Sequence, residues 1–347
     1  MRVLILSHRD VVAALPPQSC AEAMAAVLAG HARGETFMPL RSVMMPPGAA
    51  GFLGLMPGWR GRPGDGAAAF ALKAVCIIPG NPGRGLDAHQ GLVTLFDGET
   101  GVPTAILDAS AVTAVRTAAV TAVATRVLAR GDARTLAVLG AGTQARAHVR
   151  ALAGVRDFEQ VRVYAPTSAH AQELVQEMTG EIAGEMAAEA AGPGGGARPG
   201  LSVAASAEEA VRGADVVVTV TSAREPVLRH AWLKPGAHVS AVGASTPQAR
   251  ELDTDTVAAS ALFCDSRESL RHEAGEFRLA VTEGKIPGEE HVRAELGEVL
   301  AGTAHGRRDP GELTLFRSLG LAIEDLAAAE TAVAAATARG IGTEVEL

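Results

Sequence analysis

A glycine-rich turn between a strand-like and a helix-like segment constrains the fold more than any other feature. It lies in Thr135-Leu-Ala-Val-Leu-Gly140-Ala-Gly-Thr-Gln-Ala145-Arg-Ala-His148, where aliphatic residues run directly into Gly-x-Gly-x-x-Ala. In this order Gly140 permits a tight turn, Gly142 lets backbone N–H groups approach a pyrophosphate, and Ala145 lets the helix pack closely on the sheet. Any strand-to-helix turn can contain Gly-x-Gly, but both flanks here favour a dinucleotide site, which we extend to Thr143 and Gln144.

The next predicted strand bears on which dinucleotide binds. The strand Val161–Tyr164 runs into Ala165-Pro-Thr-Ser168, with no Asp or Glu where NAD-preferring sites place one for the ribose hydroxyls. Because no carboxylate stands there to repel a 2′-phosphate, the sequence favours NADP over NAD, with Thr167, Ser168 and His170 as candidate contacts. A later buried strand ends in the hydroxyls of Thr221 and Ser222, and we add both to the cofactor site because ligands of open α/β sheets bind at such ends.

Composition limits the class of protein. The chain has 347 residues, 48% of them hydrophobic, which is enough for two domains with large cores. Its formal charge is −8 with Lys and Arg scattered, which argues against nucleic acid and anionic membranes as partners. No long uninterrupted apolar run predicts a membrane span, and the N-terminus is typical of a strand rather than a signal peptide. Cys20, Cys76 and Cys264 lack metal-ligand spacing, so we expect no metal site and buried, reduced thiols in a cytoplasmic protein.

Three isolated cations precede the glycine-rich turn. Lys73 lies in a predicted strand, Ala67–Ile78, that is apolar on both faces, and Arg116 lies in a long predicted helix of small residues, Ala109–Leu128. A buried cation needs a partner, so a ligand carboxylate or a structural carboxylate would satisfy either residue. Alternatively, Lys73 extends to solvent from the sheet margin. Arg41 interrupts an apolar run, which a surface strand also tolerates.

Five segments occur in an order that points to one family. They are Ala71-Leu-Lys-Ala74, Val115-Arg-Thr-Ala-Ala119, Gly140–Ala145, Val242-Gly-Ala-Ser-Thr-Pro-Gln-Ala-Arg-Glu-Leu252 and Thr314-Leu-Phe-Arg-Ser-Leu-Gly320. Each segment is weak evidence alone, but the ordered set is specific. From about residue 35 to its end, the chain resembles the ornithine cyclodeaminase/mu-crystallin family.

The resemblance implies an α/β fold in which a Rossmann-type dinucleotide-binding domain is inserted in a discontinuous α+β substrate and dimerisation domain. The expected bounds are residues 1–125 and 311–347 for the discontinuous domain and 126–310 for the Rossmann domain, and a homodimer is expected. The resemblance also implies that Arg41, Lys73 and Arg116 bind the α-carboxylate of a small-molecule substrate. Four residues of the segments that carry the resemblance are expected to contact the cofactor: Val242, Gly243, Ser245 and Ser318.

One departure within the family bears on the reaction. Cyclodeaminases typically carry an aspartate before the proline of the Gly-Ala-Ser-Thr-Pro segment, where it interacts with the substrate amine. Here Ser245 and Thr246 precede that proline, as in the mu-crystallin-like ketimine reductases. The resemblance therefore implies NAD(P)H-dependent reduction of a ketimine or 2-imino acid carboxylate, in which hydride goes to the C=N carbon and Lys73 is either the proton donor or purely a carboxylate ligand. The alternatives are an alanine-type amino acid dehydrogenase or ornithine cyclodeaminase, and a non-catalytic NADP-dependent ligand-binding protein.

Overall fold

The chain forms two compact units. The computed structural model describes residues 1–62, 67–189 and 199–346. One unit comprises Met1–Val120 with Gly320–Leu347, and the other comprises Thr121–Leu319. The sequence placed the second boundary at residue 310, but it lies later because β15 (Thr314–Arg317) pairs with β12 and β13 of the inserted unit.

The inserted unit contains a parallel sheet of the Rossmann type, as the sequence predicted. Its strands follow the order β10-β9-β8-β11-β12-β15-β13-β14, so the direction of winding reverses between β8 and β11. Every adjacent pair is parallel. Besides β15, the strands are β8 (Thr135–Leu139), β9 (Gln160–Tyr164), β10 (Gly200–Val203), β11 (Val216–Thr219), β12 (His238–Ala241), β13 (Ala261–Cys264) and β14 (Val292–Glu295).

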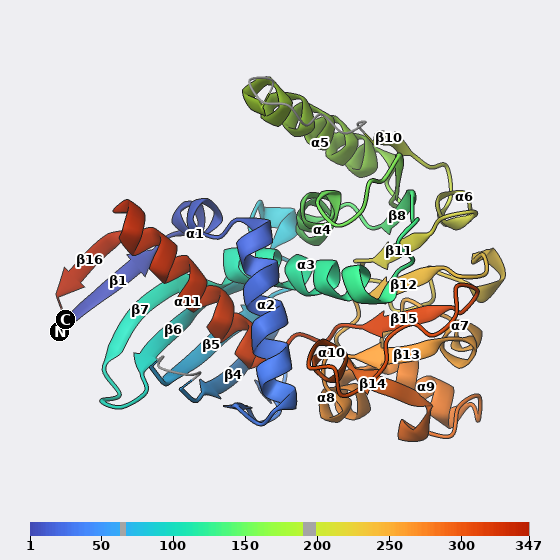
Figure 1. The fold of residues 1–347 in the computed structure, drawn as a ribbon. Coiled ribbons are helices and arrows are strands. Elements are labelled where there is room, and N and C mark those ends of the chain that lie inside the picture. The colour runs from blue at the N-terminus through green and yellow to red at the C-terminus, as the bar shows by residue number, and fades with distance from the viewer. Residues whose placement is uncertain (63–66, 190–198, 347) are drawn as a thin grey trace. The chain divides into compact units, whose positions relative to one another are not determined.

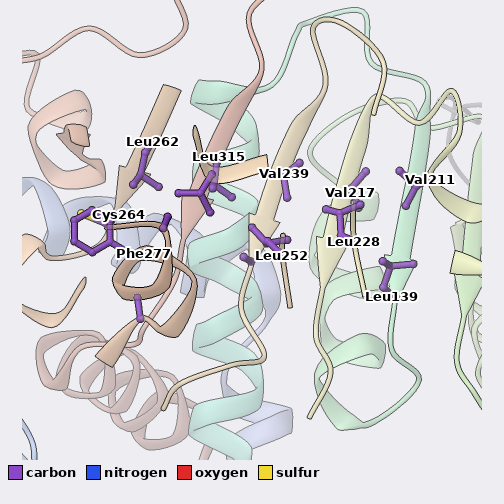
Figure 2. Packing of buried hydrophobic residues seen from close by; sticks show 14 of the residues in the cluster. Leu139, Val211, Val217, Leu228, Val239, Leu252, Leu262, Cys264, Phe277 and Leu315 are labelled. Atoms are coloured by element: carbon purple, nitrogen blue, oxygen red, sulfur yellow. The ribbon is translucent and has the colours of Figure 1, made fainter. Parts of the chain in front are cut away.

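The core of the inserted unit explains why these short segments are strands. Val217, Val239 and Leu315 lie on neighbouring strands, and Leu228 and Leu252 pack against them from connecting segments (Figure 2). Because the central part of a parallel sheet is covered on both faces, β11, β12, β13 and β15 are buried along their whole length, whereas the outer strands β9, β10 and β14 alternate. The helices of the unit are α4 (Thr143–Ala153), α5 (Ser168–Glu189), α6 (Ala207–Val211), α7 (Thr254–Ala259), α8 (Arg267–Glu273), α9 (Gly275–Thr282) and α10 (Leu296–Leu300).

The discontinuous unit contains a mixed sheet. Its strands follow the order β16-β1-β7-β6-β5-β4-β2, with β3 also paired to β4. Only the pair β1 and β7 is parallel among the described pairs of this sheet. The strands are β1 (Arg2–Leu6), β2 (Thr36–Phe37), β3 (Ser42–Met44), β4 (Phe52–Arg60), β5 (Ala69–Ile77), β6 (His89–Asp97), β7 (Pro103–Asp108) and β16 (Thr343–Glu346).

Strand β5 alternates as its sequence predicts. Ala71, Lys73 and Val75 are buried, whereas Phe70 and Cys76 on the opposite face are exposed. Cys76 therefore departs from the expectation of buried thiols. Helix α11 (Ala322–Arg339) crosses β4, β5 and β6 and packs beside α2 (Pro17–Ala32), and the short helix α1 (His8–Ala14) contacts α11 (Figure 1).

The predicted long helix of small residues is confirmed as α3 (Ala109–Leu128). Among the described residues, α3 is long and apolar enough to cross a membrane, and the sharply bent pair α1 and α2 passes the same test together. Most of α3 is buried inside the protein, and the core helix of a globular protein passes this test as well.

Candidate functional site

In the discontinuous unit, Lys73 is held by the first turn of α11. Its Nζ donates to Asp325 Oδ1 at 3.0 Å and lies 2.9 Å from Asp325 Oδ2. A further hydrogen bond of 3.1 Å reaches Thr113 Oγ1 on α3. Lys73 is only 3% exposed and Asp325 only 1%, so Lys73 does not extend to solvent from the sheet margin.

Arg116 and Arg41 meet at the same end of α11. The Arg116 Nε donates to Asp325 Oδ1 at 3.0 Å, and its Nη1 donates to Glu324 Oε2 at 2.8 Å. Arg41 Nη2 donates to the carbonyl of Gly320 at 2.8 Å. Gly320 has a φ of +78°, and a Cβ there would lie 2.5 Å from Arg116 Nη1. Glycine is therefore required at this position both for the backbone conformation and for the approach of the guanidinium.

Sequence reasoning missed the two carboxylates of this cluster. Glu324 and Asp325 are fully or almost fully buried at the start of an alanine-rich helix. Two consecutive acids in the first turn of an otherwise apolar helix were the available signal, but acids at a helix start are commonly explained by the helix dipole. The structure brings Lys73 and Arg116 onto these acids, and Arg41 onto the Gly320 carbonyl just before the same helix.

The electrostatics of the cluster make Lys73 able to exchange a proton near neutral pH. Burial lowers the pKa of Lys73 to about 8; the charges of Arg116 and Arg41 act in the same direction, and Asp325 opposes them. Burial acts to raise the pKa of Asp325, but the charges of Lys73 and Arg116 prevail and hold it below its usual value. Lys73 and Arg116 thus share the Asp325 carboxylate while the charge of Arg41 also acts on Lys73, and such a cluster of cations attracts a further anion and can supply a proton to it.

In the inserted unit, the predicted strand, turn and helix are all present around the glycine-rich segment. Gly140 follows β8 with a φ of +123°, and a Cβ there would lie 2.6 Å from the carbonyl oxygen of Val220. Its N–H donates to the Tyr164 carbonyl at 2.8 Å. Gly142 caps α4 without a side-chain hydrogen bond, and no atom lies within 4 Å of where its Cβ would be. Ala145 is fully buried. The first turn of α4 therefore presents N–H groups to open space, which suits a pyrophosphate.

The remaining cofactor candidates follow the carboxyl ends of strands in the same parallel sheet, so they share one edge of it. Most of them are at least partly exposed, whereas Ser318 is 2% exposed and its Oγ has no hydrogen-bond partner among the described residues. The candidates are Thr167 and Ser168 after β9, Thr221 and Ser222 after β11, Val242, Gly243 and Ser245 after β12, and Ser318 after β15.

Comparisons with known proteins agree with this arrangement. A model of the ornithine cyclodeaminase/mu-crystallin family matches residues 1–338. The ketimine reductase mu-crystallin of Mus musculus is 35% identical over 297 residues, which cover 86% of this chain and 84% of the mouse protein.

Two solved structures are similar over nearly the whole chain. The Δ1-pyrroline-2-carboxylate reductase of Thermococcus litoralis, in complex with NADH and L-proline, superposes with a TM-score of 0.90 at 34% identity, covering 99% of this chain and 100% of that one. An archaeal alanine dehydrogenase, described as a dimer with bound NAD, superposes with a TM-score of 0.88 at 32% identity, with complete coverage of both chains. Sequence, fold and site geometry therefore lead to one conclusion: this chain belongs to the ornithine cyclodeaminase/mu-crystallin family.

Proposed function

We propose that this protein is an NAD(P)H-dependent reductase of a cyclic ketimine or 2-imino acid carboxylate. The observation that carries the proposal is the cluster of three cations at the start of α11, where Lys73 and Arg116 bind the buried Asp325 and Arg41 binds the Gly320 carbonyl. The relatives named for reduction of a C=N bond, the mouse ketimine reductase and the pyrroline-2-carboxylate reductase of Thermococcus litoralis, support this choice of substrate class.

Each residue of the cluster has a distinct task in this reaction. Arg41 and Arg116 would hold the substrate carboxylate and so fix the plane of the C=N bond. Lys73 Nζ would donate a proton to the imine nitrogen, which its pKa of about 8 allows. Asp325, which pairs with both Lys73 and Arg116, would keep the ammonium charged and oriented between turnovers. The nicotinamide, when bound, supplies the hydride that the imine carbon accepts.

The cofactor is proposed to be NADP rather than NAD. The Gly140–Ala145 turn fits a pyrophosphate, and Thr167 and Ser168 are exposed after β9 with no acid between Tyr164 and Ser168. The two similar structures hold NADH and NAD, so the choice needs a direct measurement. Dissociation constants for NADPH and NADH, measured by nicotinamide fluorescence, provide it; tighter binding of NADH would contradict the proposal.

A homodimer is also proposed, formed through the mixed sheet. On the face of that sheet opposite the buried side of β5, Phe70 is 46% exposed and Leu92 is 52% exposed. Large apolar side chains gathered on one open sheet face are typical of an interaction surface. The similar archaeal alanine dehydrogenase is described as a dimer. Light scattering on the purified protein tests this, and Phe70→Asp is expected to shift the mass toward the monomer.

Turnover assays separate the reductase from its alternatives. With NADPH, we expect oxidation of the cofactor in the presence of piperideine-2-carboxylate or pyrroline-2-carboxylate. Turnover of L-alanine or L-ornithine with NAD, without imine reduction, would instead identify an amino acid dehydrogenase or a cyclodeaminase. Tight NADPH binding without turnover of any imine or amino acid would identify a binding protein. Intact turnover in both Lys73→Ala and Arg116→Ala would refute the carboxylate cluster as the substrate site.

A further inference from the structure

We propose that Glu251 is a positioning residue that fixes the ends of β11 and β12 where they face the dinucleotide. This inference rests on the nicotinamide cofactor of the proposed function. Glu251 is fully buried and lies in the loop after β12, outside the glycine-rich turn. No direct contact with the cofactor is needed for its role, because it acts through the backbone that carries the candidate cofactor contacts.

The Glu251 carboxylate joins two strand ends. Its Oε1 accepts from the N–H and the Oγ1 of Thr221, both at 2.7 Å. Its Oε2 accepts from Thr219 Oγ1 at 2.9 Å, from the Gly243 N–H at 2.7 Å and from the Ala244 N–H at 3.3 Å. One side chain therefore satisfies donors at the carboxyl ends of both β11 and β12, which lie next to each other in the sheet.

The backbone of Glu251 is also fixed by hydrogen bonds. Its carbonyl accepts from the N–H groups of Val227 and Leu228 at 2.8 and 3.0 Å. Its own N–H donates to Glu276 Oε1 at 2.9 Å. The following residue, Leu252, is fully buried in the apolar core of the unit (Figure 2). The carboxylate is therefore presented by a rigid segment, as a positioning role requires.

The same network reaches a third strand end. Glu276 Oε2 accepts from Arg317 Nε at 3.2 Å, and Arg317 Nη1 donates to the carbonyls of Ala241 at 2.8 Å and Ser318 at 2.5 Å. The end of β15, which carries Ser318, is thus tied to the end of β12. Through Glu251 and this arginine, buried charges hold the ends of three strands that carry cofactor candidates.

Close packing explains why Gly243 belongs to this network. A Cβ at Gly243 would lie 2.1 Å from the Thr221 carbonyl oxygen and 2.6 Å from Glu251 Oε1. The two strand ends therefore approach more closely than any other residue would allow. Glycine makes the approach possible, and the carboxylate fixes its geometry.

The chemistry of the site requires a carboxylate rather than an amide. The N–H groups of Thr221 and Gly243 can only donate, and each meets a different oxygen of Glu251. An amide would replace one oxygen with a donor, so one backbone N–H would lose its acceptor in either orientation. The pKa of Glu251 lies above its usual value, because burial and the nearby Glu276 outweigh the lowering effect of the Thr221 donors and the Arg317 charge.

The test compares Glu251→Gln with a matched variant at the opposite edge of the same sheet. Asp215 is also buried and accepts from two backbone N–H groups, those of Arg134 at 2.9 Å and Thr135 at 3.0 Å, at the amino end of β8. The dissociation constants of NADPH and NADH are measured by fluorescence, together with KM for the nucleotide, kcat and the unfolding midpoint. Glu251→Gln is expected to weaken nucleotide binding about tenfold to hundredfold, the effect of losing a charge-assisted hydrogen bond.

The control distinguishes positioning from general stability. Asp215→Asn is expected to lower the unfolding midpoint while leaving the nucleotide dissociation constant within about threefold of the wild-type value, since an about threefold change is below 1 kcal/mol. Wild-type affinity in Glu251→Gln, or equal weakening in both variants, would overturn the inference. Should Glu251→Gln not fold, Thr219→Val removes a single donor to the carboxylate, and an unchanged dissociation constant there would overturn it too. A wild-type protein that binds neither nucleotide would refute the proposed function itself.

Discussion

Replacing Asp325 with asparagine should move the pH dependence of imine reduction. In the wild type, the Lys73 ammonium has a pKa of about 8 because burial and the nearby arginines oppose the stabilising charge of Asp325. The neutral amide of Asp325→Asn keeps the size of the side chain but removes that charge. Burial and the charges of Arg116 and Arg41 still lower the pKa of Lys73, but the Asp325 charge that raises it is gone, so the pKa falls further.

The size of the shift follows from the geometry. Both carboxylate oxygens of Asp325 lie within 3.0 Å of Lys73 Nζ, and an opposite charge at such a distance is worth about one to three pKa units. A shift of two units, about 2.7 kcal/mol, would place the pKa near 6. At pH 7.5 the ammonium fraction would then fall from about three quarters to about 3%, a drop of about 25-fold.

The assay is the pH profile of kcat/KM for reduction of a cyclic ketimine, which reports the ionisation of the free enzyme. Because the protonated amine is the donor, activity should be constant at low pH and fall as pH rises through about 8 in the wild type. In Asp325→Asn the fall should begin at a pH lower by about one to three units. Glu324→Gln is the matched control, since the Glu324 carboxylate pairs with Arg116. An unmoved profile in Asp325→Asn, or a fall through pH 8 that persists in Lys73→Arg, would refute the assignment of Lys73.

Three further predictions address the two units separately. Gly320→Ala should raise KM for the imine, because the new Cβ meets Arg116. It should also lower the unfolding free energy by more than the cost of a left-handed backbone alone, about 1–2 kcal/mol. The control is Gly34→Ala, which has the same φ of +78° and no neighbour within 4 Å, so its urea unfolding measures the backbone cost by itself. Thr167→Asp should weaken NADPH binding relative to NADH about tenfold, measured by fluorescence titration, and an unchanged ratio would place the 2′-phosphate elsewhere. Burial lowers the pKa of His148 to about 4, so between pH 6.5 and pH 4 the unfolded chain binds more protons than the folded one. The free energy of unfolding should therefore fall from pH 6.5 toward pH 4, by about 3 kcal/mol in total. In His148→Gln, the free energy measured by urea unfolding should depend less on pH over this range.

The sequence predicts those parts of the fold that local patterns determine. The Gly140 turn and the long helix α3 are predictable because apolar periodicity and glycine spacing act over a few residues. Strands β14 and β15 were not predicted because each is only four residues long; β14 alternates over too few residues to stand out, and β15 is buried throughout without alternating. Their pairing is decided by the sheet that surrounds them rather than by their own residues.

For the site, the sequence predicts the residues that break a local pattern but not their partners. Lys73 and Arg116 stand out because each is a lone charge in an apolar segment. Asp325 follows Lys73 by 252 positions and Glu251 follows Thr219 by 32, so no local spacing relates either acid to the groups that it binds. Such contacts come from the tertiary fold, which brings a helix end or a loop against a strand.

The two buried acids differ in what they hold, and this difference decides what each can do. Asp325 faces an amine whose pKa of about 8 lies within the working range of an enzyme, so a change in its charge alters a protonation state. At Glu251, the donors are backbone N–H groups and hydroxyls, which do not titrate near neutral pH. A carboxylate of the first kind belongs to the chemistry, because it sets how readily a proton is given up. The Glu251 carboxylate only fixes distances between strand ends. Its loss should therefore lower the affinity for the cofactor and leave the pH profile of kcat/KM in the same position.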